Sequence, residues 1–195
     1  MAHPASPPAL RAVLLDRDGV LNVNRPGYVR SPDDWEWLPG ARTGYGLLAA
    51  AGLPLAVITN QSAIGRGLMT TSHLDAIHAR MAADLTADGS APPHVLYCPH
   101  TPEAACACRK PRPGMVLRAL TLTGAAPHEA VLIGDHESDL RAAAAAGCRS
   151  LHVRSGRGPL PTHPPPGCLG SVPNLHAAAL LLSGSTNPHA TAPRR

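Results

Sequence analysis

Two carboxylates stand two positions apart at the end of a short apolar run. Residues 12–15 are apolar and are followed by Asp16 and Asp18. Alternation along an extended chain would place both carboxylates on one side with Arg17 turned away, and Gly19 permits a sharp turn after them. Such a pair could supply a nucleophile and a proton donor to one substrate. A polar turn at a strand end explains the same residues equally well, because Asp and Gly are frequent in turns.

Two further strand-like runs also end in polar residues. Residues 55–58 precede Thr59, and residues 131–133 precede Gly134 and Asp135. The carboxyl ends of parallel strands gather at one edge of a sheet, so we expect these side chains to converge with the first pair. Thr59 could donate its hydroxyl to a phosphoryl oxygen, although a turn at the strand end would also explain it.

A carboxylate at each of two strand ends suits a hard cation. Mg²⁺ binds oxygen ligands and keeps several waters, which fits Asp16 and Asp135 at one edge. Asp135 and Asp139 could instead cap the following helix and offset its dipole. We expect Asp135 to bind the metal and Asp139 to act as a cap.

Lys110 is the only lysine in the chain, and it directly follows Arg109. The compact charge of an ammonium can sit against a phosphoryl group without imposing the planar fork of a guanidinium. The position therefore favours a phosphate-binding role for Lys110. A lysine that occurs by chance in an arginine-rich sequence would explain this observation equally well.

Four soft metal ligands lie close together just before this lysine. They are Cys98, His100, Cys106 and Cys108. They suffice for a tetrahedral Zn²⁺ site, although their one-residue spacings are tighter than the usual finger pattern. Because protein ligands would fill all four positions, we expect a structural zinc that fixes the loop presenting Arg109 and Lys110.

The composition indicates which residues build the core, which partners are expected and in which compartment the protein is expected. Apolar residues make up 44% of the 195 residues and aromatic residues only 3%, so Ala, Leu and Val must build the core. The net charge of +4 suits a nucleic acid and a phosphorylated small molecule equally well. The arginines are scattered and stacking aromatics are scarce, so we do not expect a nucleic-acid partner. We expect a cytoplasmic protein, because no run approaches the roughly 18–20 apolar residues of a membrane span and residues 1–8 lack a secretory pattern. We also expect a monomer.

Strand-like and helix-like segments alternate along the chain. The expected strands are residues 13–15, 55–58, 95–97, 131–133 and 151–153. The expected helices are residues 41–51, 70–87, 113–122, 140–146 and 174–182. This alternation predicts an α/β fold with a doubly wound, mainly parallel sheet. We expect one domain over residues 10–183, a Gly/Pro-rich loop over 155–167, and frayed tails at 1–9 and 184–195.

Together these motifs resemble those of the haloacid-dehalogenase-like (HAD-like) phosphohydrolases, in the branch of histidinol phosphatases and heptose-bisphosphate phosphatases. The resemblance runs from about residue 12 to residue 153. Its motifs are DRDGVLN at 16–22, TNQS at 59–62, CPH at 98–100, CACRKP at 106–111 and GD at 134–135. RPGYV at 25–29 and WEWLPG at 35–40 are more similar to the heptose enzymes. The resemblance implies a HAD-like Rossmannoid fold, and the short segments at the usual insertion points leave no room for a cap domain.

The resemblance also implies a role for each motif. Asp16 would attack phosphorus and form an aspartyl-phosphate, and Asp18 would protonate the leaving oxygen and then activate water. Asp16, Asp135 and the backbone carbonyl of Asp18 would hold Mg²⁺. Thr59 and Lys110 would steady the phosphoryl oxygens. The residues implied in substrate binding are Asn24, Arg25, Gly27, Tyr28, Asn60, Gln61, Ser62, Arg109 and His136.

The activity implied is Mg²⁺-dependent hydrolysis of a heptose 1,7-bisphosphate at its 7-phosphate. A histidinol phosphatase, another sugar-phosphate phosphatase and a polynucleotide 3′-phosphatase are the enzyme alternatives, and a non-catalytic zinc-bearing interaction module is the alternative of another class. Two features depart from the heptose enzymes. His136 stands where they commonly have Lys, which bears on phosphate affinity and substrate identity. The loop between the two pairs of zinc ligands is also shorter than in many relatives.

Overall fold

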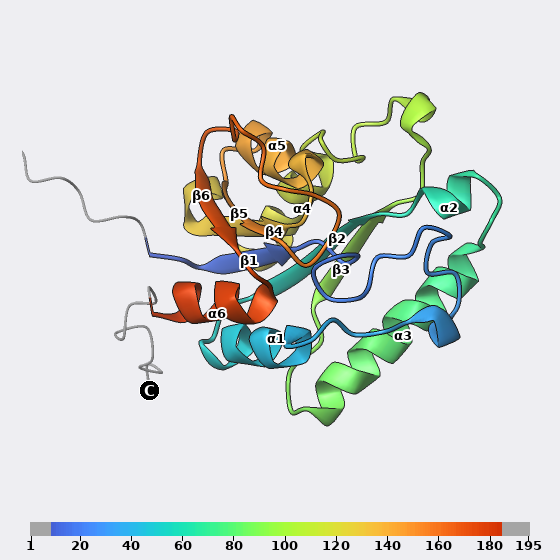
Figure 1. The fold of residues 1–195 in the computed structure, drawn as a ribbon, viewed down its shortest axis with the longest axis horizontal. Coiled ribbons are helices and arrows are strands. Elements are labelled where there is room, and N and C mark those ends of the chain that lie inside the picture. The colour runs from blue at the N-terminus through green and yellow to red at the C-terminus, as the bar shows by residue number, and fades with distance from the viewer. Residues whose placement is uncertain (1–8, 185–195) are drawn as a thin grey trace, which may run out of the picture.

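Six parallel strands form the only sheet in the part of the chain that the computed structural model describes, residues 9–184 (Figure 1). Their order is β3–β2–β1–β4–β5–β6, and every neighbouring pair is parallel. The strands are β1 (Ala12–Leu15), β2 (Leu55–Asn60), β3 (His94–Cys98), β4 (Ala130–Gly134), β5 (Arg149–Val153) and β6 (Cys168–Val172). The expected α/β class with a parallel sheet is confirmed.

Helices cover both faces of this sheet. They are α1 (Ala41–Ala50), α2 (Ser62–Gly65), α3 (Thr71–Ala87), α4 (Gly114–Thr123), α5 (Glu137–Ala145) and α6 (Leu175–Ser183). Val13 and Leu15 of β1 pack with α1, α3 and α6 on one face, while Ala12 and Leu14 pack with α4 and α5 on the other. Because both faces are covered, every residue of β1 is buried, which is why the strand is an unbroken apolar run.

Two helices begin at residues whose side-chain oxygens cap them. Thr70 Oγ1 accepts a hydrogen bond of 3.2 Å from the backbone N–H of His73 at the start of α3. Asn174 Oδ1 accepts one of 3.0 Å from Ala177 at the start of α6. Both bonds satisfy backbone donors that have no partner within the helix.

Three elements differ from those expected. β6 and α2 were not predicted, and α5 begins at Glu137, one turn earlier than the expected 140. β6 lies at the sheet edge and is partly exposed, so its residues need not form the apolar run that would predict a strand. It also contains Gly170, whose φ is +113°. The first turn of α5 is polar and carries no apolar periodicity that could mark it.

The strand order determines where a ligand can bind. Successive connections run from β1 outward through β2 and β3, and the chain then returns to place β4 on the other side of β1. In open parallel sheets, ligands bind beyond the carboxyl ends of the strands at this switch point. The residues that follow β1, β2 and β4 therefore meet in one region.

The segments at which a cap domain could be inserted are short. Among residues 9–184, the connection from β1 to α1 holds only the 3₁₀ turn Pro32–Asp34, and the connection from β3 to α4 holds only Pro102–Ala104. The fold is therefore capless over the described residues, as expected. The tails predicted at 1–9 and 184–195 fall outside the described residues except at positions 9 and 184.

No helix among the described residues is long and apolar enough to cross a membrane. The expected cytoplasmic location and the monomeric state stay predictions.

Candidate active site

Three carboxylates meet at the switch point between β1 and β4. Asp16 follows β1 and donates its backbone N–H to Ile133 of β4 at 2.9 Å, so the two chains stay paired as they enter the site. Oxygen atoms of Asp16, Asp135 and Asp139 lie within 4.8 Å of one another. Asp16 and Asp135 line a cavity of about 410 Å³, together with the other side chains described below.

The ammonium group of Lys110 compensates part of the negative charge of this cluster. Its Nζ lies 2.9 Å from Oδ1 of Asp16 and 2.7 Å from Oδ1 of Asp139, and it donates to the Ile58 carbonyl at 2.8 Å. The side chain is only 1% exposed. Burial alone would lower the pKa of Lys110, but Asp139 and Asp16 outweigh it and raise the pKa, so the ammonium stays charged.

Asn60 fixes the backbone of that lysine. Its side-chain amide donates to the Lys110 carbonyl at 3.0 Å and its Oδ1 accepts from the Lys110 N–H at 3.1 Å. Both ends of the Asn60 amide are therefore engaged with the protein. Asn60 lines the cavity, as expected of a substrate-binding residue, but its hydrogen bonds position Lys110.

Asp139 does more than cap the helix. Oδ2 accepts from the backbone N–H of His136 at 3.1 Å, which is the expected cap, while Oδ1 pairs with Lys110. Gly134 makes this close approach possible, because a Cβ at that position would lie 2.3 Å from the Asp139 Cβ. The ion pair with Lys110 was not foreseen from the sequence.

Asp18 is held by three side chains. Arg17 donates to both carboxylate oxygens at 3.1 and 3.0 Å, Asn22 donates at 2.9 Å, and Gln61 donates at 2.9 Å. The expectation that Arg17 turns away from the pair is wrong. β1 ends at Leu15, so strand alternation no longer applies, and the buried guanidinium folds back onto Asp18.

The two acids after β1 differ in their electrostatics. Burial raises the pKa of Asp16 to about 6, although Lys110 opposes the rise. Burial also acts to raise the pKa of Asp18, but Arg17 and the hydrogen bonds to Asp18 outweigh it and hold the pKa below its ordinary value. Asp16 therefore takes up a proton at a higher pH than Asp18 does.

Thr59 and Gln61 extend this arrangement from the end of β2. Gln61 Nε2 donates to Thr59 Oγ1 at 2.8 Å as well as to Asp18, and Thr59 is 1% exposed. With its oxygen accepting from Gln61, the Thr59 hydroxyl can direct its own proton into the cavity that it lines. Ser62 opens α2 at the same cavity.

The loop after β5 closes the site on Asp135, a contribution that sequence reasoning missed. The backbone N–H of Arg157 donates to Asp135 Oδ2 at 2.7 Å, and Ser155 Oγ donates to the Gly19 carbonyl at 2.8 Å. A Cβ at Gly156 would lie 1.9 Å from Asp135 Oδ2, and a Cβ at Gly19 would lie 2.3 Å away. Burial raises the pKa of Asp135, and the nearby Asp16 carboxylate adds to the rise.

The other residues expected to bind substrate are placed as follows. Asn24, Arg25, Tyr28, Arg109 and His136 line the cavity, whereas Gly27 is not among its lining residues. Arg109 donates to the His100 carbonyl at 3.2 Å, and His136 Nδ1 accepts from the Ser138 N–H at 3.2 Å as the N-cap of α5. Arg66, Pro102 and Arg157 also line the cavity and had no sequence signal.

The cysteine and histidine side chains before Lys110 converge. The ligand atoms of Cys98, His100, Cys106 and Cys108 all lie within 4.8 Å of one another. Their sulfur–sulfur distances are 3.3–3.5 Å, far longer than the ~2.05 Å of a disulfide. A tetrahedral zinc with Zn–S bonds of about 2.3 Å separates its sulfurs by about 3.8 Å, so the set suits a four-coordinate metal.

Buried carboxylates at the switch point, with a charged lysine against two of them, define the class as phosphoryl-transfer enzymes of the HAD-like fold. A family model described as HAD-hydrolase-like matches residues 107–166. The chain is 40% identical over 150 residues to the D-glycero-beta-D-manno-heptose-1,7-bisphosphate 7-phosphatase of Pseudomonas putida, which covers 76% of this chain and 85% of that protein. It is 39% identical over 148 residues to the corresponding alpha-heptose phosphatase of Mycobacterium bovis, covering 72% and 78%. The chain belongs to the HAD-like phosphatases, in the heptose-bisphosphate phosphatase branch.

Solved structures agree with this placement. The D,D-heptose 1,7-bisphosphate phosphatase of Bordetella bronchiseptica, crystallised with magnesium and phosphate, aligns with a TM-score of 0.80 at 36% identity, covering 89% of this chain and 98% of that one. The Burkholderia thailandensis enzyme of the same name aligns with a TM-score of 0.65 at 33% identity, covering 87% and 96%.

Proposed function

We propose that this protein is a Mg²⁺-dependent phosphatase that hydrolyses the 7-phosphate of D-glycero-D-manno-heptose 1,7-bisphosphate through an aspartyl-phosphate. The observation that carries the proposal is one cavity lined by Asp16, Asp18, Asp135 and Lys110. The names of the relatives, which include both anomers of this sugar, support the substrate.

Asp16 is the nucleophile in this proposal. A carboxylate oxygen attacks phosphorus, the bond from phosphorus to the sugar oxygen breaks, and an acyl phosphate forms on Asp16. Its pKa of about 6 leaves Asp16 largely ionised at neutral pH. Lys110, held against Asp16 at 2.9 Å, can neutralise the charge on the phosphoryl oxygens, and the Thr59 hydroxyl can donate to them.

Asp18 moves the proton. A phosphate dianion near Asp18 would raise the pKa of this carboxyl, which allows it to protonate the departing sugar oxygen. After the sugar leaves, the ionised Asp18 can take a proton from the water that attacks the aspartyl-phosphate. The bond from phosphorus to the Asp16 oxygen then breaks, which releases inorganic phosphate and restores the Asp16 carboxylate. Arg17, Asn22 and Gln61 keep the carboxylate in one position throughout.

The donor set fits Mg²⁺. Asp16 and Asp135 bring two hard oxygen ligands to the switch point. Burial raises the pKa of both carboxyls, and the Asp16 charge adds to the rise at Asp135, so a cation bound by both would offset this repulsion. The ion would be held by Asp16, Asp135 and the backbone carbonyl of Asp18. Asp139 instead forms an ion pair with Lys110. When bound, Mg²⁺ offsets negative charge on the phosphoryl group.

The four-ligand cluster fits a structural Zn²⁺, because four protein ligands would complete a tetrahedral shell. Its place on the chain directly before Arg109 and Lys110 lets it fix the loop that carries the phosphate-binding lysine.

A phosphate-release assay with Mg²⁺ tests the proposal. The substrates are both heptose 1,7-bisphosphate anomers, histidinol phosphate and 3′-phosphorylated DNA, and the highest kcat/KM is expected for a heptose bisphosphate. Preference for histidinol phosphate or DNA would refute the substrate while retaining the mechanism. Absence of phosphate release from every substrate would instead favour the non-catalytic interaction module.

A further inference from the structure

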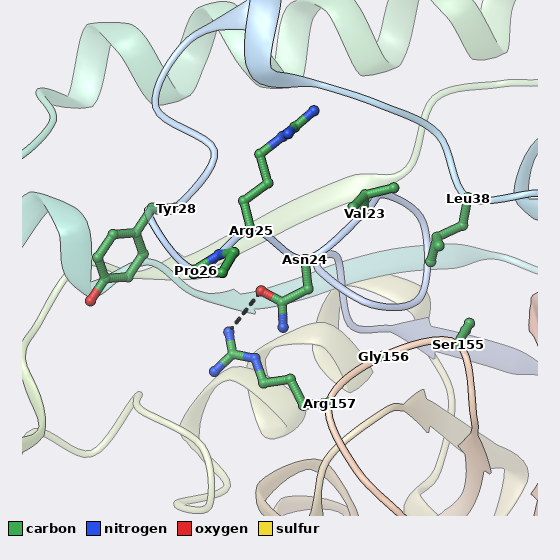
Figure 2. Close-up of a pocket in the computed structure, with 9 residues that line it drawn as sticks. All are labelled: Val23, Asn24, Arg25, Pro26, Tyr28, Leu38, Ser155, Gly156 and Arg157. Atoms are coloured by element: carbon green, nitrogen blue, oxygen red, sulfur yellow. Dashed lines mark hydrogen bonds between the residues drawn. The ribbon is translucent and has the colours of Figure 1, made fainter.

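A second cavity of about 520 Å³ adjoins the reaction site between the loop after β1 and the loop after β5 (Figure 2). Asn24, Arg25, Tyr28 and Arg157 line both cavities, so the two spaces share a wall. Because the two cavities adjoin at these residues, a substrate whose reacting phosphate lies at Asp16 can extend into the second cavity.

The charge of the second cavity is positive. Its lining includes Arg25 and Arg157 and contains no Asp or Glu. The Arg25 guanidinium donates to the Asp34 carbonyl at 2.8 Å and to Glu36 at 3.1 Å, and Figure 2 shows it extended away from Arg157. The charge of Arg25 is thus already balanced by a carboxylate.

Arg157 has a different environment. Its Nη2 donates to Oδ1 of Asn24 at 3.2 Å, a neutral acceptor, and within residues 9–184 its guanidinium forms no ion pair. The guanidinium therefore carries a charge that an anion entering the cavity could meet. Arginine suits this task because its planar fork can bind a phosphate through two hydrogen bonds at once.

The backbone of Arg157 is fixed relative to the reaction centre. Its N–H is bonded to Asp135 at 2.7 Å, and the neighbouring Gly156 lies so close to that carboxylate that no side chain would fit there. The Arg157 side chain thus projects from a point tied to a metal-binding candidate. This connection fixes, relative to the reaction centre, the backbone position from which the guanidinium reaches into the cavity.

We propose that Arg157 is a specificity-determining residue that binds the second, non-reacting phosphate of a bisphosphorylated sugar in this cavity. The inference rests on the proposed function, because it assumes that the first phosphate reacts at Asp16. On binding, a phosphate oxygen replaces Asn24 as the acceptor of the guanidinium. The consequence is selection of bisphosphates over monophosphates.

The test compares wild type with Arg157→Met on heptose 1,7-bisphosphate and on heptose 7-phosphate. Methionine retains the backbone N–H bonded to Asp135 and much of the apolar stem, while it removes the charge. We expect kcat/KM for the bisphosphate to fall about 10- to 100-fold, as for a lost hydrogen bond to a charged group, with little change for the monophosphate. Arg157→Lys keeps the charge without the fork and should give an intermediate loss.

Arg154→Met is the matched control. Arg154 lies on the same loop, but its guanidinium donates to the Ser171 carbonyl at 3.3 Å, and it is not among the lining residues of either cavity. This variant should keep the wild-type ratio of kcat/KM for the two substrates. Unfolding temperatures of all variants verify that the fold is retained.

The outcomes separate this inference from the proposed function. Wild type that hydrolyses neither heptose phosphate would refute both. Wild type that hydrolyses the bisphosphate, together with an Arg157→Met variant whose ratio is unchanged, would refute only the inference. An equal loss on both substrates would also refute it, because Arg157 would then act on the reaction centre through its contact with Asp135.

Discussion

The Nζ of Lys110 lies 2.7 Å from Oδ1 of Asp139, and the two side chains are 1% and 0% exposed. The other oxygen of Asp139 closes the amino end of α5 by accepting from His136. One buried carboxylate therefore holds both a helix start and the lysine that we propose to bind phosphate. Because Lys110 also contacts Asp16, the position of the proposed nucleophile depends on this pair.

Asp139→Asn should destabilise the protein strongly. Removing one partner of a buried ion pair costs about 3–5 kcal/mol, because the remaining charge is left poorly compensated. Lys110 retains Asp16, so we expect the lower end, about 3 kcal/mol in the free energy of unfolding by urea. The exposed Asp75→Asn on α3 is the control and should change stability by less than about 0.5 kcal/mol. A loss of the same small size for Asp139→Asn would show that the pair is not a stabilising element.

Arg17→Met should separate the positioning of Asp18 from its chemistry. The guanidinium contributes two hydrogen bonds to Asp18 and lies 5.9 Å from the Trp35 ring centroid. Without it, kcat should fall about 100-fold from misplacement of the carboxyl. The pKa of Asp18 should also rise, and because water activation needs the ionised form, the acidic limb of kcat should move to higher pH.

The readout that matters for Arg17→Met is the pH profile of kcat. A fall in kcat with no movement of the acidic limb would contradict control of Asp18 by Arg17. The exposed ion pair of Arg42 with Asp88 provides the control variant Arg42→Met, which should leave the profile unchanged.

His78 makes stability depend on pH. Burial, together with the nearby Arg17 charge, lowers the pKa of His78 from 6.5 to about 4. As pH falls from 6.5 toward 4, the unfolded chain binds a proton that the folded chain does not, so His78 destabilises the fold as pH falls. Between pH 7.5 and pH 5 wild type should lose about 2 kcal/mol relative to His78→Gln.

Urea unfolding at these two pH values measures that difference. The exposed His128→Gln variant should keep the pH dependence of wild type. If His78→Gln lost stability in parallel with wild type, His78 would not be the titrating group.

The convergence of the candidate site was predictable from the sequence, because it follows from the parallel sheet. Asp16, Thr59 and Asp135 each follow an apolar strand, and adjacent parallel strands bring such residues together. The cap role of Asp139 was likewise readable from its place directly before the expected helix start at residue 140. Expectations about chemistry at these residues stay predictions that the variants test.

Contacts that depend on tertiary packing were not predictable in the same way. Arg157 lies in a Gly/Pro-rich segment without periodicity, and its approach to Asp135 is set by how the loop folds back over Gly19. The contact of Arg17 with Asp18 was not predictable from strand alternation, because β1 ends at Leu15 and residues 16–18 lie beyond it. The pairing of Lys110 with Asp139 joins a loop residue to the first turn of α5, and no local sequence pattern encodes how close these two segments lie in space.

Cys106→Ser tests the zinc cluster. Loss of one ligand should reduce bound zinc, measured by metal analysis, from about one ion per chain, and should lower the unfolding temperature. Activity should fall because the loop carrying Lys110 loses its anchor. Cys168 lies outside the cluster, so Cys168→Ser should keep zinc, stability and activity. Wild type purified without chelator that contains no zinc would contradict the site.

Phosphate release by Asp16→Asn is the most direct measurement of the central claim. The substitution replaces the nucleophilic carboxylate by a neutral amide but leaves Lys110 paired with Asp139, so the fold should persist with an unfolding temperature near that of wild type. The account predicts that wild type releases phosphate from a heptose 1,7-bisphosphate with Mg²⁺ and that Asp16→Asn releases none. Phosphate release by the folded variant at a rate near that of wild type would contradict nucleophilic attack by Asp16.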